Sequence, residues 1–178
     1  MKLQVRSGVF ETNSSSTHSL AISTEKGLKL KFPKKVVFKY GEFGWEERTL
    51  KSTKDKASYL YTAIFYFDAK IREQYIRFIF DTLVENNIEC HFDGDIKYTV
   101  STWGFDRNNP SIYFSENIDG YIDHAENLGF IEKICTDKQL LLSYLFSEHS
   151  FIKTGNDNSA SDISINVNYD HQEFYKGN

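Results

Sequence analysis

The sequence has few of the residues that build special scaffolds, with 2 cysteines, 2 prolines and 1 methionine among 178 residues. Cys90 and Cys135 are too few for a disulfide framework, so we expect buried structural thiols in a reducing compartment. The chain lacks a run of the roughly 20 apolar residues that span a bilayer. Residues 1–6 also lack the apolar core of a signal peptide. The sequence therefore predicts a cytoplasmic protein that is not associated with a membrane.

Aromatic residues are abundant, with 15 Phe, 11 Tyr and 2 Trp, and 40% of all residues are apolar. A chain of this length and composition can bury a core of its own, and no linker or internal repeat divides it. We therefore predict a single domain over residues 1–178. Its start (1–50) is β-rich, its middle (52–87) is helical and its end (88–178) is mixed.

Charge is distributed unevenly along the chain. Residues 1–60 contain 12 Lys and Arg against 6 Asp and Glu, whereas residues 61–178 contain 9 against 19. If the two regions occupy different surfaces, one would attract phosphate or an acidic partner and the other a metal ion or a basic groove.

Alternation of apolar and polar residues predicts several strands in the first 50 residues. Residues 2–10 form the first, and after a polar loop a second runs over Ser19–Ser23 with Leu20 and Ile22 inward. Further strands are predicted at 28–32, at 36–40 and near 45–50. Pro33 separates the first two of these three, because proline lacks the N–H that a sheet requires.

Helical spacing begins after residue 51. Leu60, Ile64 and Phe67 form one stripe, with a capping residue within 52–55, and a second stripe runs from Ile71 to Leu83 and ends at Asn86 and Asn87.

Strands are predicted at 88–92, 97–101, 111–114 and 163–169, with a hairpin signal at 93–94. A helix is predicted over 137–147, capped by Thr136 or Asp137; the segment 119–134 fits neither pattern clearly. The order of elements predicts an α+β fold with a largely antiparallel sheet and two to three helices packed mainly on one face.

The segment Asn13–Ser19 is rich in hydroxyl groups and is predicted to be a loop between two strands. Such a loop could cradle an anion or orient a nucleophile, although short polar residues also form ordinary turns. His18 lies two positions from Ser16, but the Gly-x-Ser-x-Gly and Gly-Lys-Ser/Thr motifs are missing. The candidate residues for an anion or ligand loop are Arg6, Asn13, Ser14, Ser15 and Ser16.

Metal ligation is a second possibility. Polar turns at 121–124 and 155–158 carry oxygen and imidazole donors that would suit zinc, the favoured ion, or another divalent cation. If the fold joins them, the ligands would be His18, Asp123, His124 and Asp157. Cys90 and His91 point to opposite faces of a strand, which disfavours a shared ion, and an array of His91, Asp93 and Asp95 competes with the hairpin.

Lysines interleave with apolar residues between positions 26 and 39. They could follow a phosphate backbone, or they could be the solvated face of an edge strand. The residues are Lys26, Lys29, Lys31, Lys34, Lys35 and Lys39.

From Arg6 to Ser19 the chain reads R-S-G-V-F-E-T-N-S-S-S-T-H-S and resembles the opening of small bacteriophage and mobile-element proteins of bacteria. The resemblance extends to 121–124 and 155–158. It implies a phage origin, and so the cytoplasm of the host cell, but it carries over no catalytic residue. Small phage proteins often bind a host machine, and anti-CRISPR proteins are the leading example. In that setting the acid-rich region 116–173 could occupy a basic nucleic-acid groove.

Two functions follow as hypotheses. The first is a non-enzymatic protein that binds and inhibits a bacterial defence machine, such as a Cas nuclease or its loading with DNA, and that a metal ion could stabilise. The second is a metal-assisted hydrolase or nucleotide-processing enzyme that uses the segment Asn13–Ser19. Direct nucleic-acid binding through the early lysines stays open.

Overall fold

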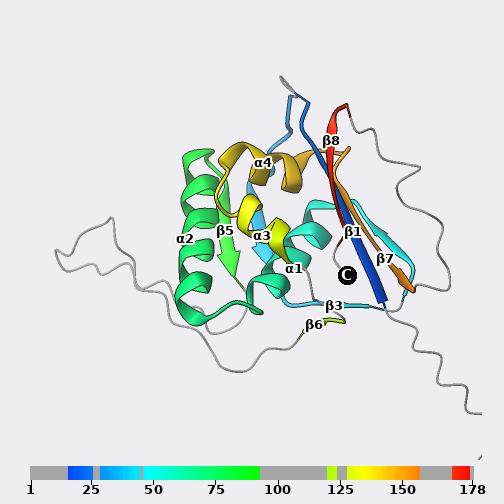
Figure 1. Cartoon of the computed structure of the whole chain (residues 1–178). Coiled ribbons are helices and arrows are strands. Elements are labelled where there is room, and N and C mark those ends of the chain that lie inside the picture. Colours follow the sequence, from blue (N-terminus) through cyan, green and yellow to red (C-terminus); the bar gives the residue numbers. More distant parts are fainter. Residues whose placement is uncertain are drawn as a thin grey trace, which may run out of the picture.

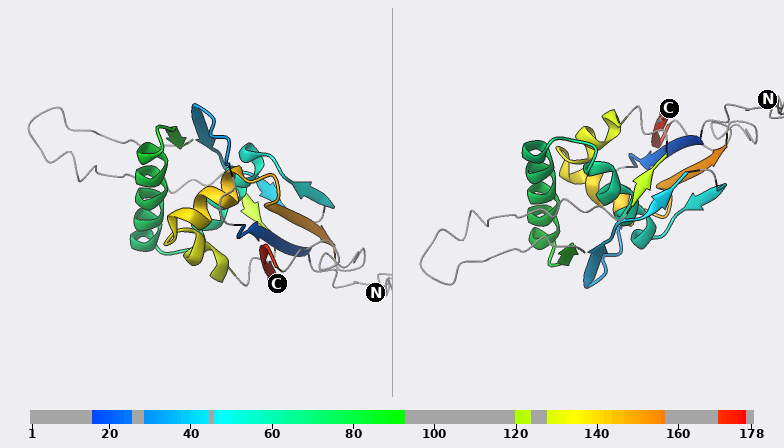
Figure 2. Two further views of the ribbon diagram at one scale, coloured as in Figure 1. Left: turned by 90° about the horizontal axis from the view of Figure 1, so that it is seen from above. Right: turned by 90° about the horizontal axis from the view of Figure 1, so that it is seen from below.

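A computed structural model of the chain describes residues 16–25, 29–44, 46–92, 120–123, 128–156 and 170–176. The chain has an α+β fold, and the helices lie to one side of a four-stranded sheet (Figure 1). This arrangement confirms the predicted fold class. Views from above and below place α2 (Ala69–Glu85) at the end of the molecule farthest from that sheet (Figure 2).

The four-stranded sheet is antiparallel and has the order β4-β7-β1-β8. Its strands are β4 (Arg48–Leu50), β7 (Phe151–Asn156), β1 (Ser16–Ser23) and β8 (Gln172–Lys176). The register places His18 opposite Thr154 and Leu20 opposite Ile152. Since β1 is paired on both edges and α4 packs against it, Leu20 and Ile22 are fully buried, as predicted.

Two short parallel ladders supplement this sheet. β2 (Lys35–Phe38) pairs with β5 (Glu89–Phe92), and β3 (Glu42–Phe43) pairs with β6 (Tyr121–Ile122). Parallel pairing needs a long connection, which α1 and α2 supply between β2 and β5.

Helix α1 (Thr53–Ile64) begins where the sequence predicts. The hydroxyl of Ser52 accepts a hydrogen bond from the backbone N–H of Asp55 over 3.1 Å, which satisfies one of the free donors of the first turn. Ala57, Leu60 and Ile64 are fully buried. The helix therefore lies in the centre of the molecule and contacts β2, α3, α4 and β6.

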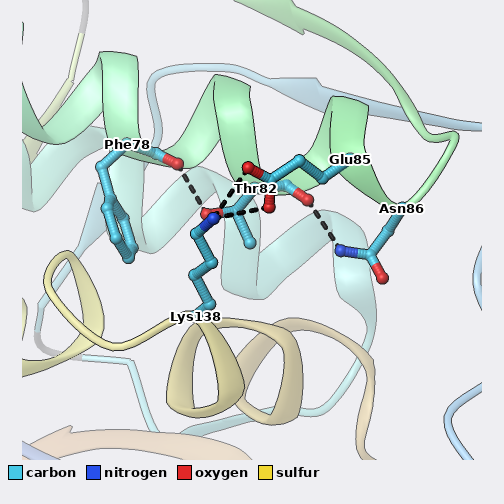
Figure 3. Close-up of polar contacts among 5 residues, drawn as sticks. All are labelled: Phe78, Thr82, Glu85, Asn86 and Lys138. Carbon is cyan, nitrogen blue, oxygen red and sulfur yellow. Dashed lines mark hydrogen bonds and ion pairs between the residues drawn. The ribbon is translucent and has the colours of Figure 1, made fainter.

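Helix α2 is followed, after its cap Asn86, by a left-handed residue, Asn87, whose φ is 58°. Its last turns carry a set of polar contacts (Figure 3). The hydroxyl of Thr82 donates to the carbonyl of Phe78 over 2.7 Å, and Lys138 forms an ion pair with Glu85 over 2.6 Å. The ion pair joins the end of α2 to the start of α4 (Lys138–Phe146).

Two helices follow the segment 120–123. α3 (Gly129–Ile134) is short, and α4 begins at the predicted cap, where the carboxylate of Asp137 accepts from the N–H groups of Gln139 and Leu140. Residues 119–134, which the periodicity left undecided, thus contain β6 and α3 among their described residues.

Aromatic rings fill the space between α1 and the β2–β5 ladder. The rings of Phe38 and Phe92 stack with centroids 4.8 Å apart, and those of Tyr40 and Tyr61 lie 4.7 Å apart. Full burial of a side chain such as Phe38 contributes roughly 1.5–3 kcal/mol to the stability of the fold. This cluster places part of the aromatic content of the sequence in the core.

Two sequence predictions are wrong. Residues 16–19 are not part of a loop, because they form the first half of β1. No strand forms in the described part of 28–32, residues 29–32, because Pro33 interrupts pairing and Phe32 instead packs edge-on against Phe146 at 5.2 Å. The strands predicted at 2–10, 97–101, 111–114 and 163–169 lie outside the described residues.

None of the helices in the described ranges is long and apolar enough to cross a membrane.

Candidate functional site

Two buried side chains at the start of β1 converge on one backbone carbonyl. The Nε2 atom of His18 lies 2.8 Å from the carbonyl oxygen of Asp123, and the hydroxyl of Ser16 donates to the same oxygen over 2.9 Å. The Ser16 hydroxyl and His18 Nε2 are 3.3 Å apart. Both side chains are at most 1% exposed. These contacts join positions that are 105 and 107 residues apart in the sequence.

The contact with the carbonyl defines which nitrogen of His18 carries a proton. A carbonyl oxygen only accepts hydrogen bonds, so Nε2 is the donor. In a neutral ring the lone pair then lies on Nδ1. Nε2 cannot serve as the base for Ser16, whose own proton is directed at Asp123. The pair Ser16–His18 is therefore not arranged as a serine nucleophile with its base.

Strand β6 holds the carbonyl of Asp123 in place. The N–H of Asp123 donates to the carbonyl of Phe43 over 2.8 Å. The hydroxyl of Tyr66 lies 2.8 Å from both the N–H and the carbonyl of Ile122, so it accepts from one and donates to the other. A Cβ atom at Gly44 would lie 2.9 Å from Cβ of Asp123, so glycine is needed for this close approach.

The ring of His18 faces the core rather than solvent. Its centroid is 6.0 Å from that of Tyr59, which is fully buried. Burial raises the pKa of the Tyr59 phenol above its ordinary value, so this neighbour stays neutral at physiological pH.

The hydroxyl-rich segment and the two polar turns that the sequence analysis identified come together at the start of β1. Ser16 belongs to the hydroxyl-rich segment, Asp123 to the turn 121–124, and Gly155 pairs with Thr17 in the ladder between β1 and β7. Of the four predicted metal ligands, His18 and Asp123 lie together, while His124 and Asp157 are outside the described residues. Of the predicted anion loop, Ser16 is described; Arg6, Asn13, Ser14 and Ser15 are not.

A cavity of about 210 Å³ lies beside this point of convergence. It shares Thr154 with the ladder opposite His18 and Gly44 with the contact to Asp123. Its polar lining consists of Glu42, Glu46, Arg48, Tyr121 and Thr154. Arg48 is paired with Glu46, which leaves a lining rich in carboxylate and hydroxyl groups.

Only two of the four predicted metal ligands, His18 and Asp123, lie within the described residues. Within the described ranges, no three His, Cys, Asp or Glu side chains are grouped closely enough to hold a metal ion. Nε2 of His18 is engaged with a carbonyl, so any ion would bind at Nδ1. Burial raises the pKa of the Cys90 and Cys135 thiols, which keeps them protonated and disfavours metal binding. A zinc site would thus require His124 and Asp157 in addition.

A buried lysine marks the opposite end of β1. The ammonium group of Lys56 donates to the carbonyls of Ser147 over 2.8 Å and Ser150 over 3.2 Å. The hydroxyl of Ser150 accepts a hydrogen bond from the N–H of Ser23, the last residue of β1. Lys56 is 1% exposed, and this burial lowers its pKa to about 8.

Sequence reasoning missed Lys56 and Tyr66. A signal for Lys56 was present, because it lies four and eight positions before Leu60 and Ile64 on the apolar stripe of α1. A lysine on such a stripe must find acceptors in the interior. Tyr66 gave no comparable signal, since its partner Ile122 is 56 residues away.

A lysine-rich surface segment runs through residues 29–39. All five of its lysines are exposed, and no acidic residue interrupts residues 29–41. Lys35 forms an exposed ion pair with Glu89 on β5. Phe32, within the same segment, is 42% exposed. We call Lys29, Lys31, Lys34, Lys35 and Lys39 the lysine strip.

No protein-family model, curated protein or solved structure matches the chain.

Proposed function

We propose that the chain is a phage-encoded binding protein that inhibits a bacterial defence machine, and that the lysine strip is the surface with which it engages a nucleic-acid-loaded effector. The observation that carries this proposal is the exposure of five lysines along one segment without an intervening acid. Lysines ordered in this way attract the phosphate backbone of guide or target strands. The resemblance at residues 6–19 supports the phage origin.

The ring of Phe32, which is 42% exposed beside its contact with Phe146, adds an apolar surface within the strip. An aromatic side chain between cations suits single-stranded nucleic acid, because its ring can stack on a base while lysines neutralise phosphates. An effector with an exposed guide or displaced strand offers both features.

Inhibition of target-DNA cleavage by a panel of guide-loaded Cas nucleases tests the proposal. We expect the wild-type protein to reduce cleavage by at least one effector, and we expect inhibition to weaken as salt is raised. The double variant Lys31→Glu/Lys34→Glu should lose about tenfold or more in inhibitory potency.

The matched control is Lys54→Glu/Lys70→Glu, which reverses two exposed lysines on α1 and α2 outside the strip. It changes the net charge by the same amount, so it should retain inhibition if the strip is the contact surface. Equal losses in both variants would show a non-specific charge effect, and unchanged cleavage across the panel would defeat the proposal.

The meeting of His18 with Asp123 favours a second candidate, a metal-assisted hydrolase or nucleotide-processing enzyme centred on the start of β1. The observed contact uses the backbone of Asp123, so Asp123→Asn preserves it and removes only the carboxylate. Turnover of nucleotide substrates that disappears in Asp123→Asn and His18→Ala, with zinc bound by the wild type, supports the enzyme. Turnover retained in both variants excludes these residues.

A further inference from the structure

A second cavity, of about 330 Å³, lies at the Ser23 end of β1. Four stretches form its walls: the end of β1, Lys51 between β4 and α1, the turn between α4 and β7, and the start of β8. Its charged and aromatic lining consists of Glu25, Lys51, Glu148, His149, Phe151 and His171. Neither of the proposed functions uses this cavity.

Hydrogen bonds between the walls fix the shape of the cavity. The N–H of Thr24 donates to the carbonyl of His171 over 2.7 Å. The side-chain amide of Gln172 donates to the carbonyl of His149 over 2.5 Å. These contacts tie β1 to the start of β8, and the start of β8 to the turn, so the backbone of these walls is preformed.

Lys56 stabilises the turn 147–150 through hydrogen bonds from the interior of the protein. Its ammonium group holds the carbonyls of Ser147 and Ser150, which flank the two cavity residues Glu148 and His149. The hydroxyl of Ser147 also accepts from the N–H of His149 over 3.1 Å. Lys56 is therefore a positioning residue for the cavity, and it does not line the cavity itself.

The charges of the lining define which ligand fits. Lys51 is a cation whose Nζ atom lies 6.0 Å from the ring centroid of Phe151, so the positive charge sits beside the aromatic wall. Glu25 and Glu148 are carboxylates. A simple anion would meet these two acids, and a simple cation would leave Lys51 unused. A ligand that carries both charges satisfies both groups.

We propose that this cavity binds a small zwitterion of the amino-acid class. Its carboxylate pairs with Lys51, its ammonium group pairs with Glu25 or Glu148, and its side chain rests on the ring of Phe151. The volume is at the lower end of the range for small-molecule sites, which suits a single amino acid.

Three probes of similar shape separate the contributions: L-phenylalanine, 2-phenylethylamine without the carboxylate, and 3-phenylpropanoate without the ammonium group. Binding to the full chain is followed by NMR titration of the amides of His149, His171 and Gln172. We expect saturable shifts with L-phenylalanine and at least about tenfold weaker binding of either analogue, since each lacks one charge-assisted contact.

Single substitutions test which residue pairs with each charge of the ligand. Lys51→Met should abolish the preference for L-phenylalanine over 2-phenylethylamine, and Glu148→Gln should reduce its preference over 3-phenylpropanoate. The controls Lys54→Met and Glu132→Gln alter exposed residues outside the cavity and should leave both preferences unchanged. Equal affinity for all three probes, tightest binding of 3-phenylpropanoate, or no saturable shift at millimolar L-phenylalanine each overturns the proposal.

Discussion

The two ends of β1 are each joined to a distant segment of the chain, but by different polar groups. At each end a buried polar side chain binds the backbone of a segment that is distant in sequence, next to a cavity. At one end, His18 and Ser16 share the single carbonyl of Asp123. At the other end, Lys56 bridges the two carbonyls of Ser147 and Ser150.

The two ends differ in the free energy that is lost when their polar groups are removed from water. The uncharged hydroxyl of Ser16 gives up little solvation, whereas burying the ammonium group of Lys56 is expensive enough to lower its pKa to about 8. The Lys56 end should therefore respond most strongly to mutation and to pH. The His18 end should depend on the hydrogen-bonding capacity of residue 18.

Lys56→Ala should have the largest effect on stability. It removes the ammonium donor from two buried carbonyls, of which that of Ser147 keeps the backbone N–H of Ser150 at 3.3 Å, and it takes a side chain out of a closely packed interior. We expect the free energy of unfolding to fall by roughly 3–5 kcal/mol, as measured by urea denaturation.

Lys54→Ala is the control, because Lys54 is exposed on the same helix. Its effect should stay within about 0.5 kcal/mol. A similar small effect in Lys56→Ala would mean that the turn 147–150 holds its conformation without the ammonium group, and the comparison between the ends of β1 would fail.

How far the fold could be read from the sequence depends on the range of the interactions. The caps at Ser52 and Asp137 and the helical stripes act within one or two turns, and these predictions are confirmed except for Phe67, which lies beyond the end of α1. The pairing of β2 with β5 joins positions 54 residues apart, and the strand periodicity of each carries no information about its partner.

The candidate site shows the same limit. Its residue types could be predicted, because hydroxyl and imidazole groups in polar segments are visible in the sequence. Their roles could not, since Ser16 and His18 act from a strand and bind the backbone of Asp123 rather than its carboxylate. A backbone acceptor has no sequence signature, so only the fold reveals it.

The buried Lys56 should also make the stability of the protein depend on pH. Between pH 8 and the ordinary lysine value of 10.5, unfolded Lys56 binds a proton that folded Lys56 has lost. Stability therefore rises with pH in this window. Relative to Lys56→Met, the wild type should gain on the order of 2 kcal/mol between pH 8 and pH 10.

The comparison with Lys56→Met cancels the other titrations in this range, because Cys135, Tyr59 and Tyr144 have raised pKa values in both proteins. Urea denaturation at several pH values measures the difference. A difference that does not change with pH would show that Lys56 keeps its ordinary pKa, and so is not desolvated in the way its burial implies.

Substitution of His18 should lower the stability less than Lys56→Ala does. His18→Leu fills most of the space but leaves the Asp123 carbonyl with the Ser16 hydroxyl as donor, so we expect a loss of about 1–3 kcal/mol. His18→Gln keeps an N–H donor and should lose less. Urea denaturation near pH 7 compares the two variants. If Gln and Leu destabilise equally, the hydrogen bond from Nε2 contributes nothing to stability, and His18 would be retained for its shape or its chemistry alone.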